Sequence, residues 1–194
     1  EVADRLRPYW NPAVPAVHVS GFVPVDALAP IGGTGAAVGS FHPLQTLPDP
    51  VRGAAALSGA WAAITAAEPL AGLLEDFAES LGMRPFALAD DAKPLYHAAA
   101  AAAANYVVEA LGVASDLLDA AHVDMAVMEP LTRRVVENVF AVGSRAALTG
   151  PIARGDLDTV RGQMRAADGV SPELGEQFRL LARATAIRAG VELE

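Results

Sequence analysis

Residues 62–88, AAITAAEPLAGLLEDFAESLGMRPFAL, contain the pattern that decides the fold. The short apolar runs 62–65 and 85–88 have the length of strands and predict two of them. Between them, residues 69–81 place leucines and a phenylalanine three and four positions apart, which predicts an amphipathic helix. Strand, helix and strand in this order indicate an α/β layer.

The spacing of apolar residues differs between the parts of the chain before and after this stretch. Residues 16–19 and 37–41 are two further short apolar runs, so four strands are expected before residue 89. From Asp90 onward the apolar residues recur with a helical period. The sequence therefore predicts an α/β part, residues 1–88, followed by an all-helical part, residues 89–194.

The helical part is expected to begin with a helix of more than twenty residues. Pro94 suits its first turn, and one of its faces is traced by Leu95, Ala99, Tyr106, Ala110, Leu117 and Leu118. Residues 123–142 are expected to form a second helix, interrupted or kinked at Pro130 and ended by Gly143.

Two more helices are expected after it. Asp156 is a suitable N-cap for the third. The last spans 172–188, and four of its side chains are expected to face inward: Leu174, Phe178, Leu181 and Ala182.

The composition excludes several classes of protein. The 194 residues carry a net charge of −9, are 53% hydrophobic and include no cysteine. A disordered tail, a disulfide framework, a thiolate metal site and a cysteine nucleophile are therefore excluded, and a cytoplasmic location is expected. Scattered basic residues in an acidic chain argue against nucleic acid or an anionic membrane as partner. The alanine run 98–104 is shorter than the ~20 apolar residues of a membrane span, so no transmembrane helix is expected.

The glycine cluster 32–35 is similar in composition to a dinucleotide-binding loop but lacks the strand before it and the helix after it. Such a loop follows a strand and opens a helix, whose amides bind the pyrophosphate. Here a strand follows the glycines, so a surface turn is favoured over a phosphate site.

Polar residues lie at or just after the ends of the first two predicted strands. They are His18, Ser20 and Gly21 after the first, and His42 and Gln45 after the second. Open α/β sheets bind ligands at the carboxyl ends of strands, and imidazole and amide groups suit orienting a carbonyl or carboxylate. The alternative is that these groups only cap loops.

Lys93, Tyr96, His97 and Asn105 form a second polar group near the start of the long helix. His97 and Asn105 lie about 12 Å apart along the helix axis, so they cannot bond directly but could flank a substrate. The alternative is a small-residue packing face with incidental polar groups. A zinc site built from the histidines lacks a nearby carboxylate or a histidine pair one turn apart, so no metal site is expected.

Arg154 lies in the loop 149–156 between two predicted helices. Its guanidinium could bind a carboxylate or phosphate through two hydrogen bonds. The alternative is an ion pair that locks the loop.

Four blocks of this sequence resemble a bacterial family of Rossmann-like proteins that end in a helical domain of unknown function. The blocks are residues 18–21, 39–46, 96–106 and 148–156, and they occur in the family's order. That family is related to ketopantoate reductase, pyrroline-5-carboxylate reductase and 6-phosphogluconate dehydrogenase. The resemblance implies that the α/β part is the second half of a Rossmann-like nucleotide-binding domain, and that the helical part is a 6-phosphogluconate dehydrogenase C-terminal-like domain for dimerisation and substrate binding.

Members of that family begin with a strand and a glycine-rich loop that do not occur in this sequence. We therefore expect the chain to be a fragment of such a reductase or a form that lacks the loop. The resemblance implies an NAD(P)-dependent oxidoreductase, with NADP or NAD as cofactor, that reduces a small oxo acid or imine by hydride transfer in the cleft between its domains.

The resemblance also implies roles for individual residues. Related reductases often use a lysine and an asparagine on the first long helix, where this sequence offers Lys93, His97 and Asn105. His97 would donate the proton, because an imidazole is a general acid near neutral pH, and Asn105 would orient the substrate. The other candidates bind ligands: His18, Ser20 and Gly21 the nicotinamide, and His42, Gln45 and Arg154 the polar groups of the substrate.

A function of another class competes with the enzyme. The chain could be a non-catalytic dimeric binding or scaffold protein that keeps the helical domain for association. A homodimer through this domain is expected in both cases, since three shorter helices cannot fully cover a long helix rich in alanine and valine.

Overall fold

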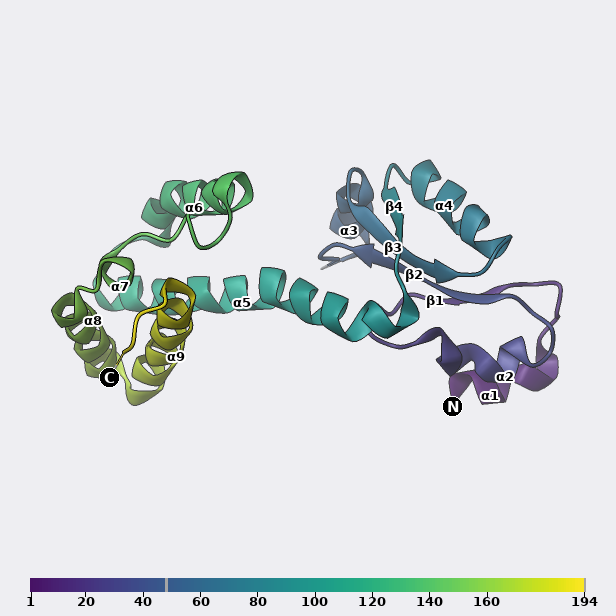
Figure 1. Ribbon diagram of the computed structural model, residues 1–194, viewed down its shortest axis with the longest axis horizontal. Helices are drawn as coiled ribbons and strands as arrows, with labels where there is room; N and C mark the ends of the chain where they lie inside the picture. The colour runs from purple at the N-terminus through teal and green to yellow at the C-terminus, as the bar shows by residue number, and fades with distance from the viewer. Residues whose placement is uncertain (48, 194) are drawn as a thin grey trace. The chain divides into compact units, whose positions relative to one another are not determined.

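The computed structural model describes residues 1–47 and 49–193 and divides into two compact units, residues 1–103 and 104–194 (Figure 1). The division falls within helix α5 (Lys93–Ala120). The predicted boundary near residue 88 differs from this division because side chains of the first turn of α5 contact the α/β part.

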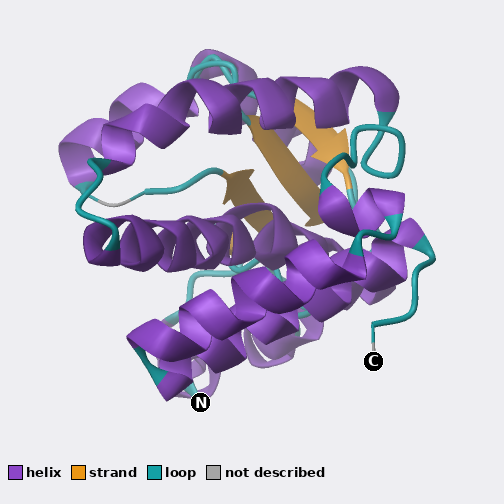
Figure 2. Cartoon of the chain, turned by 90° about the vertical axis from the view of Figure 1, so that its left-hand side faces the viewer, coloured by secondary structure: helices purple, strands orange, loops and turns teal. Residues whose placement is uncertain are grey.

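The first unit is built on a four-stranded sheet. Its strands are β1 (Ala16–His18), β2 (Val38–Leu44), β3 (Trp61–Ala66) and β4 (Arg84–Ala87), in this order across the sheet. All four were expected from the sequence, and all the strands of the described chain, orange in Figure 2, belong to this unit. β1 and β2 are parallel, β2 and β3 antiparallel, and β3 and β4 parallel. The predicted α/β class is confirmed.

Helix α4 (Leu70–Ser80) covers one face of this sheet, as the pattern in residues 69–81 predicts. The core that it forms with the sheet consists of Phe41, Ala62, Ile64, Leu70, Leu74, Ala78 and Met83. Residues of one strand point alternately to its two faces. The neighbours of the core residues along β2 and β3 therefore lie on the opposite face, where the candidate site is found.

Short helices fill the rest of the first unit: α1 (Val2–Leu6), η1 (Arg7–Tyr9), η2 (Val25–Leu28), α2 (Ala29–Gly32), α3 (Pro50–Leu57) and η3 (Asp90–Ala92). The glycine cluster 32–35 ends α2 and turns into the approach to β2, with Gly35 at a φ of 97°. The expected turn is therefore confirmed, since a helix precedes these glycines and a strand follows them.

The second unit is helical throughout its ordered elements. After α5 come η4 (Met125–Met128), α6 (Glu129–Val142), α7 (Pro151–Arg154), α8 (Leu157–Val170) and α9 (Pro172–Ala189). The helical region 123–142 is interrupted just before Pro130, one of the two outcomes expected, because η4 ends at Met128 and α6 begins at Glu129. Pro130 therefore lies in the first turn of α6, where its missing N–H costs nothing, and does not kink the helix. Gly143 ends the helix as predicted, with a φ of 84°.

Helices α8 and α9 pack against each other through small and branched residues. Val160 and Ala167 of α8 are buried, as are Leu174, Ala182 and Ala186 of α9. The caps hold this pair in place: Asp156 accepts a hydrogen bond from the Thr159 amide, and Ser171 accepts one from the Leu174 amide. Both starts were expected from the sequence.

Helix α5 is far less buried than its apolar composition suggests. Residues Asp90–Ala120 are long and apolar enough, by length and composition alone, to cross a membrane, and only 6% of the most apolar stretch is buried. The expectation of no such helix rested on the seven residues 98–104, whereas the continuous helix is much longer. Leu95 and Tyr106, which were expected to share one face, are both exposed.

Candidate functional site

The candidate site lies on the face of the sheet opposite α4, where strand register sets neighbouring side chains in rows. One row contains His42 of β2, Ala63 of β3 and Phe86 of β4. The sequence placed His42 after its strand, but β2 continues to Leu44, so His42 lies within it. Residues directly opposite each other in neighbouring strands share a face, so these three side chains point to the same side.

Tyr96, in the first turn of α5, contacts both ends of this row. Its hydroxyl lies 2.9 Å from Nδ1 of His42, and the two rings meet edge to face at 5.6 Å between centroids. On its other side Tyr96 meets Phe86 at 5.9 Å. Ala63 between them has a side chain small enough to leave room for the phenol ring. The sequence grouped Tyr96 with the polar residues of this helix but assigned it no role, because its partner His42 is 54 residues away.

His97, the next residue of α5, faces His42 and the loop that follows β1. Its ring centroid is 6.2 Å from that of His42 and 5.8 Å from that of Phe22. Gly21 in the same loop approaches His42 so closely that a Cβ there would lie 2.7 Å from Cε1 of the imidazole. The structure thus brings together predicted residues of three segments, Gly21, His42 and His97, and adds Phe22 and Tyr96.

Burial shifts the acid–base properties of this cluster. It lowers the pKa of His42, and the positive charges that His97 and Lys93 can carry lower it further. Burial also raises the pKa of Tyr96. At neutral pH the pair is therefore a neutral imidazole beside a neutral phenol.

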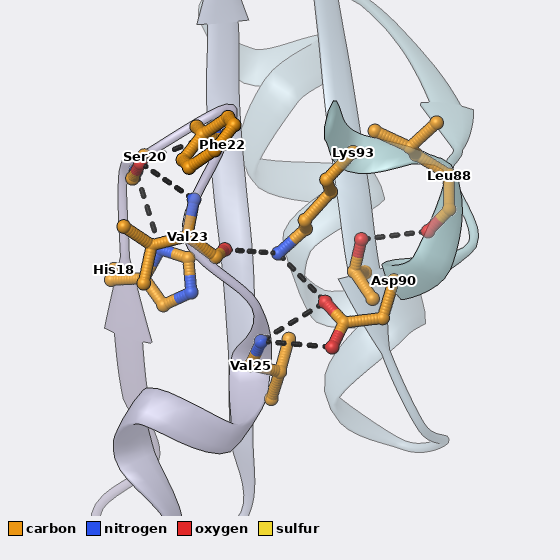
Figure 3. Close-up of polar contacts among 9 residues, drawn as sticks. His18, Ser20, Phe22, Val23, Val25, Leu88, Asp90 and Lys93 are labelled. Carbon is orange, nitrogen blue, oxygen red and sulfur yellow. Dashed lines mark hydrogen bonds and ion pairs between the residues drawn. The ribbon is translucent and has the colours of Figure 1, made fainter. Parts of the chain in front are cut away.

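Lys93, in the same first turn of α5, is buried and already paired (Figure 3). Its side chain is 1% exposed, and Nζ lies 3.0 Å from both the Val23 carbonyl oxygen and Oδ1 of Asp90. Asp90 also accepts hydrogen bonds from the Val25 amide. Although burial acts to raise the pKa of Asp90, the Val25 amide and Lys93 outweigh it and lower that pKa. Together Lys93 and Asp90 tie the loop after β1 to the start of α5.

His18 and Ser20 form a local turn at the end of β1 (Figure 3). The Ser20 amide donates to Nδ1 of His18 at 3.2 Å, and the Ser20 hydroxyl oxygen accepts from the amides of Phe22 and Val23. Nε2 of His18 is buried without a hydrogen-bond partner in the described part of the chain. Burial lowers the pKa of His18, as does Lys93, while the Pro24 carbonyl and Asp90 act in the opposite direction.

The remaining predicted residues lie outside this cluster. Gln45 is exposed, and its amide bridges the Ala56 carbonyl and the Thr46 amide. Arg154 is exposed at the end of α7, and no ion pair involves it among residues 1–47 and 49–193. Asn105 belongs to the second unit. Over the same ranges, no group of three or more histidine or acidic side chains could hold a metal ion.

A family model described as a domain of unknown function, DUF2520, matches residues 60–185. This range covers β3, β4 and every helix from α4 to most of α9. The chain belongs to the DUF2520 family. Its sequence matches no curated protein.

The crystal structures that are similar to the DUF2520 chain include the following two. One is named “putative NADP oxidoreductase”, from Bacteroides fragilis, with a TM-score of 0.74 and 23% identity over 88% of this chain. The chain spans only 64% of that protein's length. The other is a protein from Thermotoga maritima, with a TM-score of 0.68 and 21% identity, and the match covers 95% of this chain and 74% of that one. At these identities the likeness establishes that the chain shares the mixed α/β fold of these two proteins.

Proposed function

We propose that this chain is part of an NAD(P)-dependent oxidoreductase that reduces the C=O or C=N bond of a small oxo acid or imine. The observation that carries the proposal is the cluster of His42, Tyr96 and His97 beside Gly21. It joins titratable groups to the loop at the carboxyl end of a strand, where α/β sheets bind ligands. The fold shared with the Bacteroides fragilis protein supports the same class.

The described residues fit one end of a nicotinamide cofactor. Ser20 and Gly21 follow β1 closely, and Nε2 of His18 at the end of that strand is buried without a hydrogen-bond partner in the described part of the chain. The imidazole of His42 occupies the space beside Gly21 that a side chain would take. The glycines of 32–35 do not fit the pyrophosphate, since they end a helix. We therefore assign the nicotinamide end to His18, Ser20 and Gly21. When bound, the cofactor supplies the hydride.

The chain's own residues would bind the substrate and move the proton. His97 is exposed and would donate a proton from its imidazole to the substrate oxygen or nitrogen. His42 would orient a polar group of the substrate. Lys93, which is buried and paired with Asp90, would hold the loop after β1 rather than transfer a proton. Asn105, Gln45 and Arg154 are candidates for substrate binding on the resemblance alone.

Titration calorimetry of the full-length gene product with NADPH and NADH tests the proposal. Saturable binding of at least one is expected, and binding of neither would contradict it. His97→Ala should abolish turnover with cofactor affinity unchanged, whereas the control His122→Asn, in the second unit, should keep both. Cofactor binding also separates the enzyme from the non-catalytic scaffold, which predicts none.

We further propose a homodimer through the second unit. Leu131, Val135 and Val142 lie on one face of α6 and are exposed. Much of α5 is exposed too, and its alanines allow a second helix to approach closely. A second copy of this chain suits these surfaces better than lipid does, because the first turn of α5 holds Lys93 and Tyr96 against the sheet. Light scattering at micromolar concentration should give twice the chain mass, and a monomer would contradict the proposal.

A further inference from the structure

The hydroxyl of Tyr96 is held in one position relative to His42. The ring of Tyr96 is in edge contact with Phe86 on one side and with His42 on the other, above the small side chain of Ala63. The oxygen-to-nitrogen distance of 2.9 Å is that of a good hydrogen bond. Tyr96 therefore contributes a directed hydrogen bond to His42 as well as packing.

The direction of this hydrogen bond follows from the chemistry of the two groups. A neutral imidazole has one donor and one acceptor nitrogen. A phenol is a strong donor and a weaker acceptor, because its oxygen lone pair is delocalised into the ring. Burial keeps the phenol protonated and the imidazole neutral. The favoured arrangement is a hydroxyl of Tyr96 that donates to Nδ1 of His42, which leaves the proton of His42 on Nε2.

Nε2 of His42 is free to bind a ligand. No hydrogen-bond partner of this atom occurs among the residues that the structure describes, and unlike Nε2 of His18 it is not fully buried. The ring as a whole lies against Gly21, since Cε1, Nδ1 and Nε2 are 2.7, 2.8 and 2.9 Å from the point that a Cβ would occupy there. A glycine at position 21 therefore allows the imidazole of His42 to pack against the loop that follows β1.

We propose that Tyr96 is a positioning residue that fixes His42 in the Nε2–H tautomer, so that Nε2–H donates a hydrogen bond to an oxygen of the substrate. The substrate part rests on the proposed function, whereas the tautomer is a property of the chain itself. A donor at this point suits a substrate with a carbonyl or carboxylate oxygen. A neutral imidazole in this tautomer neither accepts a proton at Nε2 nor readily gives up the one it holds there, so His42 acts in binding and His97 is left as the proton donor.

Nitrogen NMR of the histidine-labelled protein tests the tautomer directly. In the wild type at pH 7.5, Nδ1 of His42 should give the shift of an acceptor nitrogen and Nε2 that of a protonated one. Tyr96→Phe keeps the ring and removes the donor, so both signals should move toward the averaged shifts of mixed tautomers. The matched control is Tyr9→Phe, at a tyrosine that is 87% exposed, and it should leave His42 unchanged.

The outcomes separate this inference from the proposed function. Protonated Nδ1 in the wild type, or the same His42 shifts in Tyr96→Phe, would overturn the inference even if NADPH binds. The wild-type spectrum alone decides the point if Tyr96→Phe does not fold. Failure of NADPH and NADH to bind would contradict the proposed function and leave the tautomer assignment standing. With an active enzyme, Tyr96→Phe should raise KM by about tenfold and leave kcat nearly unchanged.

Discussion

Gly21 is the residue at which the candidate site is most sensitive to added volume. In Gly21→Ala the new methyl group would meet the imidazole of His42, which the bond to Tyr96 holds in place. The imidazole must move, and we expect a loss of about 1–3 kcal/mol in the free energy of unfolding, measured by urea denaturation. Gly72→Ala in α4 is the control, since its Cβ makes only ordinary contacts and should stabilise that helix. Equal effects of the two substitutions would contradict the close approach.

Asp90 and Lys93 should respond unequally to neutralisation. Asp90→Asn leaves the buried ammonium of Lys93 with a carbonyl and no counter-charge, which should cost about 3 kcal/mol of unfolding free energy. Lys93→Met leaves a carboxylate that is partly exposed and still accepts from Val25, so the loss should be smaller. Asp91→Asn, at the exposed neighbour, should change stability by less than about 0.5 kcal/mol. Thermal or urea unfolding measures all three, and a larger loss for Lys93→Met would show that the pair is mainly a packing element.

The two half-buried histidines, His18 and His42, should make the protein less stable in mild acid. The pKa of His42 and that of His18 lie below the ordinary value of 6.5 in the folded chain. Below pH 6.5 the unfolded chain therefore binds protons that the folded chain does not, so the free energy of unfolding falls as the pH is lowered. His42→Gln should reduce this dependence between pH 7 and 5 in a series of urea titrations. An unchanged slope would mean that His42 titrates alike in both states.

At the scale of elements, the caps of the last two helices are where local chemistry acts most clearly. Ser171 accepts the Leu174 amide and also ends α8, since its own amide donates to the Ala167 carbonyl. Ser171→Ala should cost about 1 kcal/mol of unfolding free energy. Ser144→Ala, at an exposed serine outside a helix, should cost much less in the same denaturation assay. A loss no larger at Ser171 would contradict the role of the cap.

The elements that could be predicted are those that depend on neighbouring residues. Asp156, Gly143 and two leucines of α4, Leu70 and Leu74, carry local signals, and each lies at the helix start, end or face expected from it. The antiparallel pairing of β2 with β3 has no such local signal, and neither does the burial of Lys93. The hydrogen bond between His42 and Tyr96 joins residues that only the folded sheet brings together. Sequence reasoning thus found His42 and His97 as candidates but not the partner that determines the tautomer of His42.

At the scale of the whole molecule, a single charged substitution on the exposed face of α6 tests the proposed dimer. Leu131 lies in the first turn of α6 and is 60% exposed, so an aspartate there is compatible with the helix and with water. Against a second copy it would bury an unpaired charge, so Leu131→Asp should shift the light-scattering mass from dimer to monomer. The matched control is Val51→Asp, at a first-turn residue of α3 that is 81% exposed, and it should remain dimeric. Both substitutions add the same charge to the first turn of a helix. A monomer from Leu131→Asp alone would therefore locate the interface on α6, and a dimer from both would exclude this face.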